Sequence, residues 1–533
     1  MSGHLVLGGG GHSHALLLRM WAMQPKNRPK GLITLVNRQI TTLYSGMVPG
    51  LVAGFYRRQE IEINLWRLAD QAGVAFVIAE ITGLDPAKQQ LLLAGRPPIN
   101  YERLSLNLGC ITREPAENLG LAIKPLEPAL SALNQSETDP CNAPIQIVGS
   151  GLAAIELALA LRHRWPKRTV QLQSKSGRIP LELQQAVAAA GVSMLQTVEP
   201  AAFEENPASL RVHCTGSQAP SLLAASGLPV DARGRVRTAA TLQVLGFPKI
   251  FACGDCAVID DDPRPASGVW AVRAAAPLAC NLEASCNQKP LKPWHPQRRA
   301  LQLMGGFDIE GKPTAWALWG SLCLGPHPWL WHWKQWIDRR FMKLFQLQSM
   351  ASDISSTDSS MLCRGCAAKV SAATLKAGLD GAGLDRLGTA PEDAAVVPSS
   401  DGAQDKPLLQ SVDGFPALIS DPWLNGRLTA LHACSDLWAC GSNVNSAQAV
   451  ITLPLAPPVL QQQLLAQTLA GIRSVLDPQQ AALIGGHTLE ARESSPAPCC
   501  LGIQVVLSVQ GSPQSRIWPK QGIQIDDQLL LSR

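Results

Sequence analysis

Charge is scarce in this chain. Only 16% of its 533 residues are Asp, Glu, Lys or Arg, and the formal net charge is +5. No basic run is interleaved with aromatic residues, so the sequence lacks the positive footprint typical of nucleic-acid binding. The 14 cysteines have no regular spacing, which argues against a secreted disulfide framework and favours reduced thiols.

Long apolar runs are missing as well. No uninterrupted apolar stretch approaches the ~20 residues that cross a bilayer. Residues 1–4 lead straight into an apolar run, without the basic and then apolar regions of a signal peptide. We therefore expect a soluble, cytoplasmic protein whose only membrane contact would be peripheral.

The order of the predicted elements points to several domains. At 533 residues the chain is too long for one core, and about three domains are expected. An apolar run at 4–7 ends in glycines at 8–11, and a helix at 14–23 and a strand at 32–36 follow. The pattern recurs as strand 145–148, loop 149–151, helix 152–164 and strand 169–173. Two such β-α-β units predict a two-dinucleotide enzyme, with the second unit inserted in the first domain.

The first glycine loop is an imperfect dinucleotide motif. Such loops bind a pyrophosphate because backbone N–H groups at a helix N-terminus point toward it. Gly9 and Gly11 fit the pattern, but His14 replaces the third glycine and Asn37 replaces the acidic residue expected after the second strand. For this loop alone, a glycine-rich turn without function is an equal alternative.

The second glycine loop fits the motif better. Gly149 and Gly151 stand in front of Ala154, and Glu156 follows. Ser174 occupies the place of the acidic ribose ligand, with Lys175 and Arg178 nearby. This pattern favours NADPH over NADH, unless these residues simply form a solvated turn.

A third segment, which follows both loops in the sequence, supports their interpretation as dinucleotide-binding loops. The apolar strand at 249–252 leads to Asp255, whose carboxylate is placed to bind the ribityl chain of a flavin. With residues 44–50, Lys124-Pro125 and residues 268–273, it resembles the FAD-dependent pyridine nucleotide–disulfide oxidoreductases, specifically their type II NADH dehydrogenase-like branch. The resemblance covers about residues 1–345. It implies FAD at Gly9, Gly11 and Asp255, and NAD(P)H at the second loop.

The redox Cys-x-x-Cys pair of the disulfide reductases is absent after the first helix. Cys253 and Cys256 have this spacing, but they flank Asp255 and are interpreted as packing residues. We therefore expect electrons to pass from the flavin directly to a small acceptor or a quinone.

Residues 314–345 are rich in tryptophan. Six Trp residues lie between Trp316 and Trp336, and Arg339-Arg340 follow. One helical face would carry Leu330, Trp333, Ile337, Phe341 and Leu344. Two interpretations are equally open, a helix on a membrane surface and a helix packed on the flavin domain. The polar residues 346–360 predict a linker.

A second set of motifs follows the linker. Its members are Cys363, Cys366, Lys369, Glu392-Asp393, Asp413, Asp436 and the Gly-Gly-His-Thr segment at 485–488. In this order they resemble selenide, water dikinase (selenophosphate synthetase), a relative of aminoimidazole ribonucleotide synthetase. The resemblance implies an enzyme that uses ATP and Mg²⁺ and forms a homodimer through this domain.

The resemblance also implies a role for each residue. Cys366 would handle the soft selenide nucleophile, and Lys369 would neutralise phosphate charge. Asp393 and Asp436 would bind Mg²⁺, a hard ion that prefers carboxylates. ATP contacts are implied for Glu392, Asp413, Gly485, Gly486, His487 and Thr488, the last four as a turn with N–H groups that face phosphates.

Two other interpretations of these residues carry less weight. A single Asp is more often a helix cap than a ligand, but the ordered set of motifs outweighs that alternative. A zinc site at Cys363 and Cys366 needs a second ligand pair, and Cys499-Cys500 has the wrong spacing for one.

The predicted architecture has three parts. Residues 1–345 form an α/β, Rossmann-like flavoprotein with two dinucleotide-binding units, the NAD(P)-binding insertion lying at about 120–240. Residues 346–360 are the linker, and residues 361–533 form an α+β ATP-binding domain of the aminoimidazole ribonucleotide synthetase type. The dikinase family has a further α/β domain with half of the cleft. We expect it to be absent, because residues 529–533 lie in the last strand before it.

The predicted function is a fusion of two enzymes. Hydride would pass from NAD(P)H to FAD and then to a selenium or sulfur species, while the second part makes selenophosphate from ATP, selenide and water. One alternative is a quinone-reducing flavoenzyme with an incidental fusion. The other is a flavoenzyme whose ATP module serves only for dimerisation. Small molecules, and no nucleic acid, are the expected partners.

Overall fold

The chain has two compact units, and each is described by itself. The computed structural model describes residues 3–113, 120–136, 144–174, 179, 181–196, 210–308, 310–320, 322–346, 370–384, 392–398, 407–415, 419–491, 503–520 and 528. Unit 1 comprises Met1–Ala94 and Asn100–Ser352, and unit 2 comprises Gly95–Ile99 and Asp353–Arg533. The division after Ser352 falls within the predicted linker, of which only Gln346 is described.

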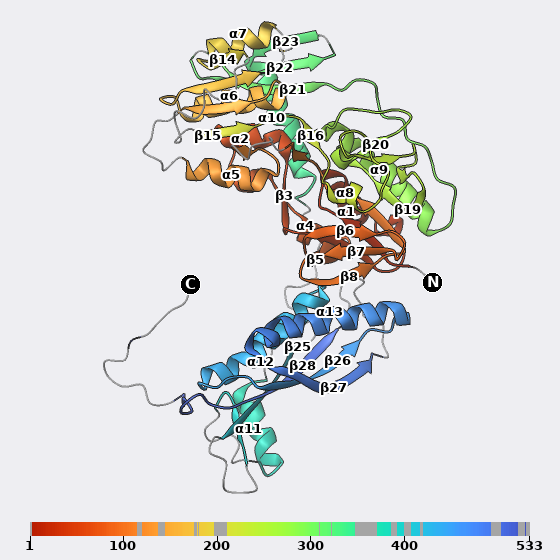
Figure 1. Ribbon diagram of the computed structural model, residues 1–533, viewed down its shortest axis with the longest axis vertical. Coiled ribbons are helices and arrows are strands. Elements are labelled where there is room, and N and C mark those ends of the chain that lie inside the picture. The colour runs from red at the N-terminus through yellow and green to blue at the C-terminus, as the bar shows by residue number, and fades with distance from the viewer. Residues whose placement is uncertain are drawn as a thin grey trace. The chain divides into compact units, whose positions relative to one another are not determined.

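Unit 1 is built on an eight-stranded sheet (Figure 1). The strand order is β20 (Ala257–Ile259), β17 (Val236–Thr238), β18 (Gln243–Val244), β19 (Phe247–Ala252), β9 (Arg103–Leu106), β1 (Leu5–Gly8), β2 (Ile33–Asn37) and β5 (Ala75–Ile78). Strands β19, β9, β1, β2 and β5 run parallel to one another, whereas β18 pairs with β19 and with β17 in antiparallel orientation. All four residues of β1 are buried, as expected for a parallel strand covered on both faces.

Helix α1 (His12–Met23) makes the crossover between β1 and β2. It packs against α9 (Gly268–Cys286) and α4 (Leu65–Gln71), and Leu17, Leu18 and Trp21 enter the core. The predicted strands and helix of this first β-α-β unit are therefore present, with bounds shifted by one or two residues. The helix begins earlier than predicted, at His12, because Gly11 serves as its N-cap.

A second sheet holds the other β-α-β unit. Its five strands are all parallel, in the order β11 (Leu121–Ala122), β15 (Leu210–His213), β12 (Ile145–Val148), β13 (Val170–Ser174) and β14 (Ser193–Gln196). Helix α6 (Leu152–Arg164) has the predicted bounds and joins β12 to β13. Two sheets with parallel central strands, each with a glycine loop after one of those strands, confirm the predicted flavoprotein fold class.

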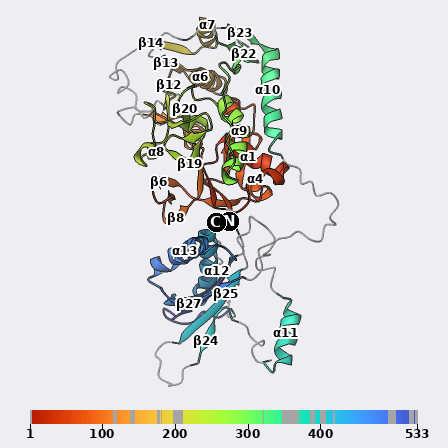
Figure 2. The same ribbon diagram turned by 90° about the vertical axis from the view of Figure 1, so that its right-hand side faces the viewer.

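A three-stranded antiparallel sheet and a long helix complete unit 1. The sheet consists of β21 (Gln302–Phe307), β22 (Pro313–Trp319) and β23 (Leu322–His327), and α10 (Pro328–Lys343) follows it (Figure 2). Smaller elements of the unit are β3 (Thr41–Leu43), β4 (Glu62–Asn64), β6 (Ile81–Asp85), β7 (Gln90–Leu93), β10 (Ile111–Thr112), β16 (Ser217–Gln218), α2 (Val48–Val52), α3 (Arg58–Ile61), α5 (Leu126–Gln135), α7 (Leu181–Ala189) and α8 (Leu222–Ala225).

The inward face of α10 differs from the predicted one. Leu330 is buried as expected, but Trp333 is 36% exposed. The other buried positions are Trp331, Lys334, Asp338 and Met342. Periodicity missed this face because two of its members are charged and become buried only as a pair.

That charged pair attaches α10 to the segment at 44–50. Lys334 Nζ lies 2.8 Å from Asp338 Oδ2 and donates a second hydrogen bond to the carbonyl oxygen of Gly46. The Tyr44 hydroxyl donates to Asp338 Oδ1 at 3.1 Å. Removing one partner of such a buried pair typically costs about 3–5 kcal/mol, because the other charge is left uncompensated. The motif at 44–50 is thus held by the helix.

Unit 2 is a five-stranded sheet with two helices on one face (Figure 1). The order is β24 (Ala395–Val397), β25 (Leu408–Phe415), β28 (Gln504–Gly511), β26 (Ser446–Leu453) and β27 (Ala482–Glu490). Helices α12 (Pro422–Ala439) and α13 (Pro458–Leu476) pack against each other and against this sheet, and α11 (Ala372–Gly381) precedes it in sequence. This is the predicted α+β domain. None of the helices described in either unit is both long and apolar enough to cross a membrane.

Candidate functional site

A cleft of about 470 Å³ opens in unit 1 where three parallel strands end. Gly9 follows β1, Cys110 lies four residues after β9, and Asp255 lies three residues after β19. All three residues line the cleft. Ligands of open α/β sheets bind at the carboxyl ends of the strands, so this cleft is the expected dinucleotide site.

The first glycine loop forms one wall of the cleft. Gly9 has φ +90°, and a Cβ atom there would come within 2.5 Å of the carbonyl oxygen of Asn107. Only glycine fits this approach. Gly11 caps α1, so the N-terminus of that helix faces the cleft, as binding of a pyrophosphate requires.

The two deviations from the dinucleotide motif have structural explanations. His14 is fully buried, with Nδ1 2.7 Å from the carbonyl oxygen of Gly9 and Nε2 2.8 Å from Ser105 Oγ. Burial lowers the pKa of His14 to about 4, so it is neutral and ties the loop to β9. The side-chain oxygen of Asn37 accepts from the Gly10 amide at 3.0 Å. Both residues therefore support the loop.

Asp255 occupies the opposite part of the cleft. Its Oδ2 atom accepts from the Cys110 thiol and from Lys124 Nζ, both at 3.3 Å, and Lys124 Nζ lies 3.0 Å from Cys110 Sγ. Its Oδ1 atom is buried and has no hydrogen-bond partner among the described residues. Because such an atom costs free energy when unpaired, it indicates a missing donor, and a ribityl hydroxyl group is of the right chemistry.

The titratable groups near Asp255 have perturbed pKa values. Burial, helped by Asp255, raises the pKa of Cys110 to about 11, so this thiol stays protonated at neutral pH. Burial alone would lower the pKa of Lys124, but the contacts with Asp255 and Cys110 together outweigh burial and raise the pKa. Burial lowers the pKa of His12, which also lines the cleft.

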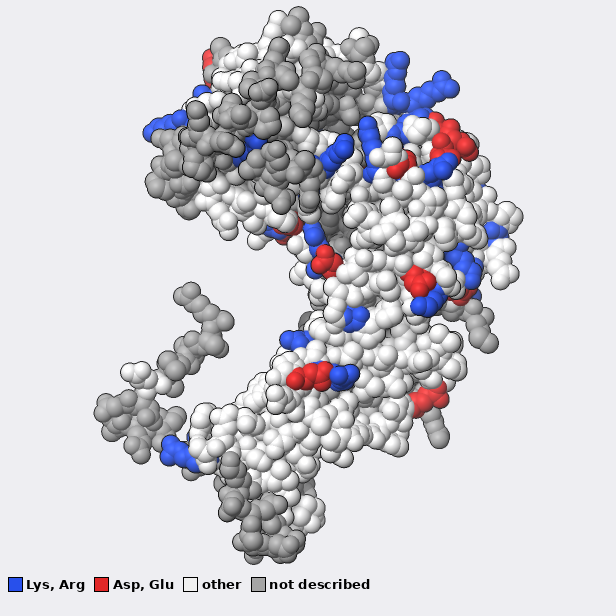
Figure 3. Space-filling model, in the orientation of Figure 1, with Lys and Arg blue, Asp and Glu red and all other residues white. Residues whose placement is uncertain are grey.

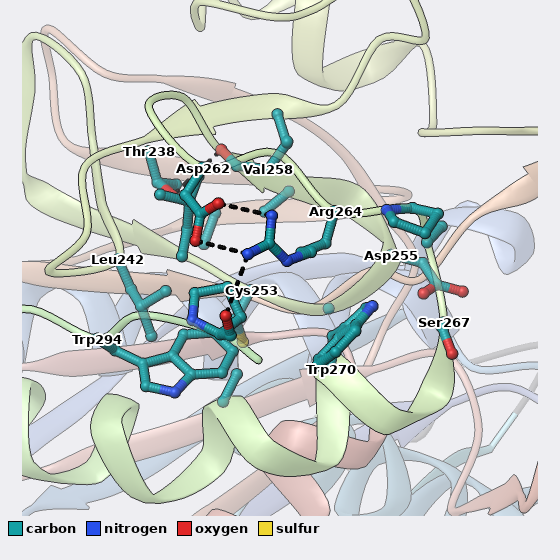
Figure 4. A pocket seen from close by; sticks show the side chains of 18 residues that line it. Thr238, Leu242, Cys253, Asp255, Val258, Asp262, Arg264, Ser267, Trp270 and Trp294 are labelled. Atoms are coloured by element: carbon teal, nitrogen blue, oxygen red, sulfur yellow. Dashed lines mark hydrogen bonds and ion pairs between the residues drawn. The ribbon is translucent and has the colours of Figure 1, made fainter. Parts of the chain in front are cut away.

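A second cavity adjoins the cleft and is much smaller, about 50 Å³. It shares Asp255, Ala266 and Ser267 with the cleft, and the rest of its lining includes Trp270, Trp294 and the Arg264–Asp262 ion pair (Figure 4). Figure 4 shows the Asp255 carboxylate turned away from the Trp294 side of this cavity. Its volume suits a few water molecules and is too small for a flavin ring.

The second glycine loop has the geometry of a dinucleotide turn. Gly149 has φ +155°, and a Cβ atom there would lie 2.8 Å from the carbonyl oxygen of Cys214, while Gly151 caps α6. Glu156 Oε1 accepts from the Gly305 amide at 2.7 Å, and burial raises the pKa of Glu156. Lys175 and Arg178 lie outside the described residues, so the preference for NADPH stays a prediction.

The cysteine pair beside Asp255 is buried. Cys253 and Cys256 are 3% and 0% exposed and form no disulfide. Burial raises the pKa of each thiol to about 12, which leaves both protonated. These features agree with packing residues and give no support to a redox pair.

In unit 2, β25 and α12 bring two predicted acids together. Asp413 Oδ2 lies 3.1 Å from His432 Nε2, and Ser411 Oγ donates to Asp436 Oδ2 at 2.6 Å. Residues two apart on a strand share a face, as do residues four apart on a helix, so the two contacts are adjacent. The predicted residues Asp413 and Asp436 thus border one polar patch.

The predicted pair Glu392-Asp393 meets a lysine. Lys520 Nζ lies 2.7 Å from Asp393 Oδ1, and its backbone amide donates to Glu392 Oε2 at 3.1 Å. Hydrogen bonding to Asp393, together with the charges of Asp393, Glu392 and Asp436, raises the pKa of Lys520. These three acids therefore lie around one ammonium group. Within the described ranges no three His, Cys, Asp or Glu side chains are arranged to hold a metal. Cys366 and Lys369 lie outside those ranges.

The predicted turn at 485–488 is wrong. Gly485, Gly486, His487 and Thr488 belong to strand β27, where they pair in parallel with residues 448–451 of β26. The glycines suggested a turn, but pairing with a neighbouring strand overrides local propensity. β27 is the last strand of the sheet order, so its outer backbone groups have no strand partner among the described residues.

Four polar residues of these sites were not predicted from the sequence. Cys110 and His12 line the flavin cleft, and His432 and Lys520 contact the acids of unit 2. Cys110 had one usable signal, its place just after an apolar strand and a glycine. For His12, His432 and Lys520 the sequence contains no such signal, and only the fold shows their positions.

The family comparisons agree with this geometry. Residues 4–275, just over half of the chain, match the pyridine nucleotide-disulphide oxidoreductase family. The chain belongs to this family. Residues 391–506 match the N-terminal domain of AIR synthase related proteins. The recognition of a type II NADH dehydrogenase-like flavoprotein followed by a domain similar to selenide, water dikinase is confirmed.

Individual relatives cover the two parts separately. The demethylphylloquinone reductase NdbB of Synechocystis is 27% identical over 342 residues, 57% of this chain and 84% of that protein. The selenide, water dikinase of Pelobacter propionicus is 30% identical over 180 residues, 32% of this chain and 47% of the dikinase. The chain thus spans about half the length of that dikinase. The sulfide:quinone oxidoreductase of Aquifex aeolicus superimposes with a TM-score of 0.50 at 16% identity over 64% of this chain and 91% of that structure, which shows the fold alone.

The chain is therefore a flavin-dependent NAD(P)H oxidoreductase fused to a selenophosphate synthetase-like domain. Its family implies FAD and NAD(P)H as cofactors.

On the face in Figure 3, blue and red side chains are interspersed over a mostly uncharged surface. No large patch of one sign is visible there.

Asp255 allows a direct test of the flavin cleft. We expect Asp255→Asn to weaken FAD binding at least tenfold, because a hydrogen bond to a charged acceptor is typically worth about 1.5–3 kcal/mol. FAD affinity is measured by fluorescence titration of the deflavinated protein. Asp260→Asn is the matched control, since Asp260 pairs with Arg237 away from the lining of the cleft. Equal affinity in the two variants would contradict the assignment.

Proposed function

We propose that this chain supplies reduced selenium with one unit and converts it to selenophosphate with the other. The observation that carries the proposal is the flavin cleft, with its unpartnered Asp255 oxygen, on the same chain as a domain similar to selenide, water dikinase. A reductase and a selenide-using domain in one polypeptide have complementary chemistry. Their coupling is the proposal.

The residues of unit 1 would hold and orient the cofactors. The N-terminus of α1 and the loop around Gly9 would bind the FAD pyrophosphate, and Asp255 would accept from a ribityl hydroxyl. The loop at Gly149 and the N-terminus of α6 would do the same for NAD(P)H. Bound FAD supplies acceptance of a hydride and release of two electrons. Since Cys253 and Cys256 are inert, the acceptor would have to approach the cleft itself.

The proposed reaction balances with elemental selenium as the acceptor. NAD(P)H and Se⁰ give NAD(P)⁺ and HSe⁻, with two electrons and the hydride's proton moving to selenium. The second unit would then turn ATP, HSe⁻ and water into selenophosphate, AMP and phosphate, as the dikinase resemblance implies. No oxidant or further reductant is required.

The residues of unit 2 fit the binding of nucleotide and magnesium. Asp393 and Asp436 offer the carboxylate oxygens that Mg²⁺ prefers, and the ion pair of Asp393 with Lys520 supports a charged carboxylate there. Glu392, Asp413 and the outer edge of β27 would contact ATP. Cys366 would guide selenide and Lys369 would neutralise phosphate charge.

Coupling of the two units can be measured directly. Under anaerobic conditions with elemental selenium, Mg²⁺ and ATP, we expect NADPH or NADH to raise AMP and selenophosphate formation at least tenfold, because HSe⁻ is otherwise absent. Phosphorus NMR and AMP release provide the readouts. The Asp255→Asn variant should lose this stimulation, yet retain activity with added HSe⁻. No stimulation of the unaltered chain would contradict the proposal.

A homodimer is proposed on the face of the unit 2 sheet that the helices leave open. Val412, Val450 and Val506 are 58%, 38% and 37% exposed, while their neighbours along the strands pack toward α12 and α13. Val450 and Val506 are direct cross-strand partners, so these apolar side chains are contiguous. A second copy of the same sheet is the simplest self-complementary cover.

The dimer predicts a clear effect of a buried charge. Val412→Glu should convert the dimer to monomers, with at least a hundredfold weaker association, because an unpaired carboxylate would be desolvated. Sedimentation equilibrium measures the dissociation constant. Val459→Glu is the control, since Val459 is 64% exposed on α13, at the helical face of the unit. A chain that is monomeric throughout would refute the proposal.

A second candidate function is favoured by the outer surface of α10 and β23. Leu322, Leu324, Trp329 and Trp336 are between 50% and 71% exposed, and Arg339-Arg340 follow. Exposed tryptophans beside cations are typical of a peripheral membrane contact. A membrane-bound enzyme would reach a quinone, and NdbB is named as a quinone reductase.

This candidate is tested with anionic vesicles. Trp329→Ser with Trp336→Ser should lower vesicle binding at least tenfold in flotation, because these indoles would lose their interfacial burial. Trp66→Ser is the control, since Trp66 is 48% exposed elsewhere in unit 1. Fast quinone reduction together with vesicle binding would favour this candidate. Absence of binding by the unaltered chain would discard it.

A further inference from the structure

The orientation of FAD in the cleft follows from the strand order. The pyrophosphate belongs at the loop around Gly9, and the adenosine belongs near the end of β2, at Asn37, on one side of that loop. The flavin half must then extend to the other side. There the cleft is lined by Cys110, Lys124, Asp255 and the first residues of α9.

Lys124 and Asp255 carry charge at that end, and the charged Glu127, which also lines the cleft, is paired with Arg58. Lys124 is an ammonium group and Asp255 a carboxylate, with 3.3 Å between Nζ and Oδ2. Cys110 contacts both groups but stays a neutral thiol, because its pKa is raised to about 11. His12 is also neutral, because burial lowers its pKa. A thiolate at Cys110 would have cancelled the charge of Lys124.

Binding of FAD would change the contacts of the Lys124–Asp255 ion pair. The unpartnered Oδ1 of Asp255 faces the proposed ribityl chain, whose hydroxyl groups would satisfy the carboxylate. Lys124 is 34% exposed and its long side chain can turn within the cleft. The ammonium group is then the one positive side chain near the ring among the described cleft residues, which otherwise include Arg38 at the adenosine end.

We propose that Lys124 is the charge-compensating residue of the flavin, which stabilises the negative charge carried by the reduced ring along its N1–C2=O edge. The inference rests on the FAD site described above. Cys110 supports it as a neutral neighbour that contacts Lys124 without adding a negative charge. A cation near N1 raises the tendency of a flavin to accept electrons. Lys124 would therefore set the driving force for hydride uptake from NAD(P)H.

The reduction equilibrium of the bound flavin provides a test that needs no turnover. Sulfite adds to the oxidised ring and leaves negative charge on the same edge, so its dissociation constant reports the compensating charge. We expect Lys124→Met to weaken sulfite binding at least tenfold, measured by bleaching of the flavin band in the holoprotein. The two-electron potential should fall by about 30 mV for each tenfold change. Lys124→Arg should restore sulfite affinity to within about twofold of the unaltered chain.

Matched variants separate charge from structural damage. Lys289→Met removes an exposed cation of unit 1 outside the cleft lining and should change nothing. Cys110→Asp keeps Lys124 but neutralises it, and should shift sulfite binding and the potential in the same direction as Lys124→Met. This variant decides the matter if Lys124→Met does not retain FAD.

The possible outcomes distinguish this inference from the proposed function. Unchanged sulfite affinity in flavin-loaded Lys124→Met, or in Cys110→Asp, would overturn the role of Lys124 even if NAD(P)H reduces the flavin and selenium is converted. Conversely, a tenfold loss would uphold it even if the chain never reduces selenium. Neither readout depends on NAD(P)H or on ATP.

Discussion

Parallel pairing of β1 with β9, and of β9 with β19, is the constraint on which the flavin cleft depends. Each strand ends at the same edge of the sheet, so residues that are far apart in sequence meet there. Gly9, Cys110 and Asp255 come together in this way. The strands belong to the buried core of the unit, and the hydrophobic effect that buries them also fixes where the polar residues converge.

Sequence motifs predict those residues of the cleft whose role depends on neighbours close in the sequence. The glycines at 9, 11, 149 and 151 were predictable because a close approach of backbones excludes any side chain. Asp255 was predictable because an apolar strand and a glycine lead directly to it. The proximity of Cys110 and Lys124 to Asp255 could not be predicted. It depends on the position of β9 between β1 and β19, and this pairing joins segments that are distant in sequence. Likewise, α10 buries Lys334 and Asp338 as a pair, which periodicity of apolar residues cannot reveal.

In the second unit, too, contacts between distant segments decide what the sequence alone could not predict. The Gly-Gly segment at 485–486 suggests a turn by composition, yet it pairs with β26 because the strand on either side of it is apolar and fits the edge of the sheet. The acids at 413 and 436 were singled out from the sequence, and their contacts with His432 and Ser411 depend on how α12 lies on β25. The spacing of the motifs identifies candidate site residues, whereas the fold determines which side chains they contact.

The neutral thiols around Asp255 connect the structure to the type of electron transfer. A dithiol relay would need at least one thiolate, but burial keeps Cys110, Cys253 and Cys256 protonated. The protonated thiols therefore agree with the prediction that electrons pass from the flavin directly to a small acceptor or a quinone. In the proposed function, selenium reduced in this way would form HSe⁻, which air reoxidises readily. Tethering the domain that consumes HSe⁻ to the domain that produces it would raise the effective concentration of the consumer near the point of release, which would be the physical advantage of the fusion.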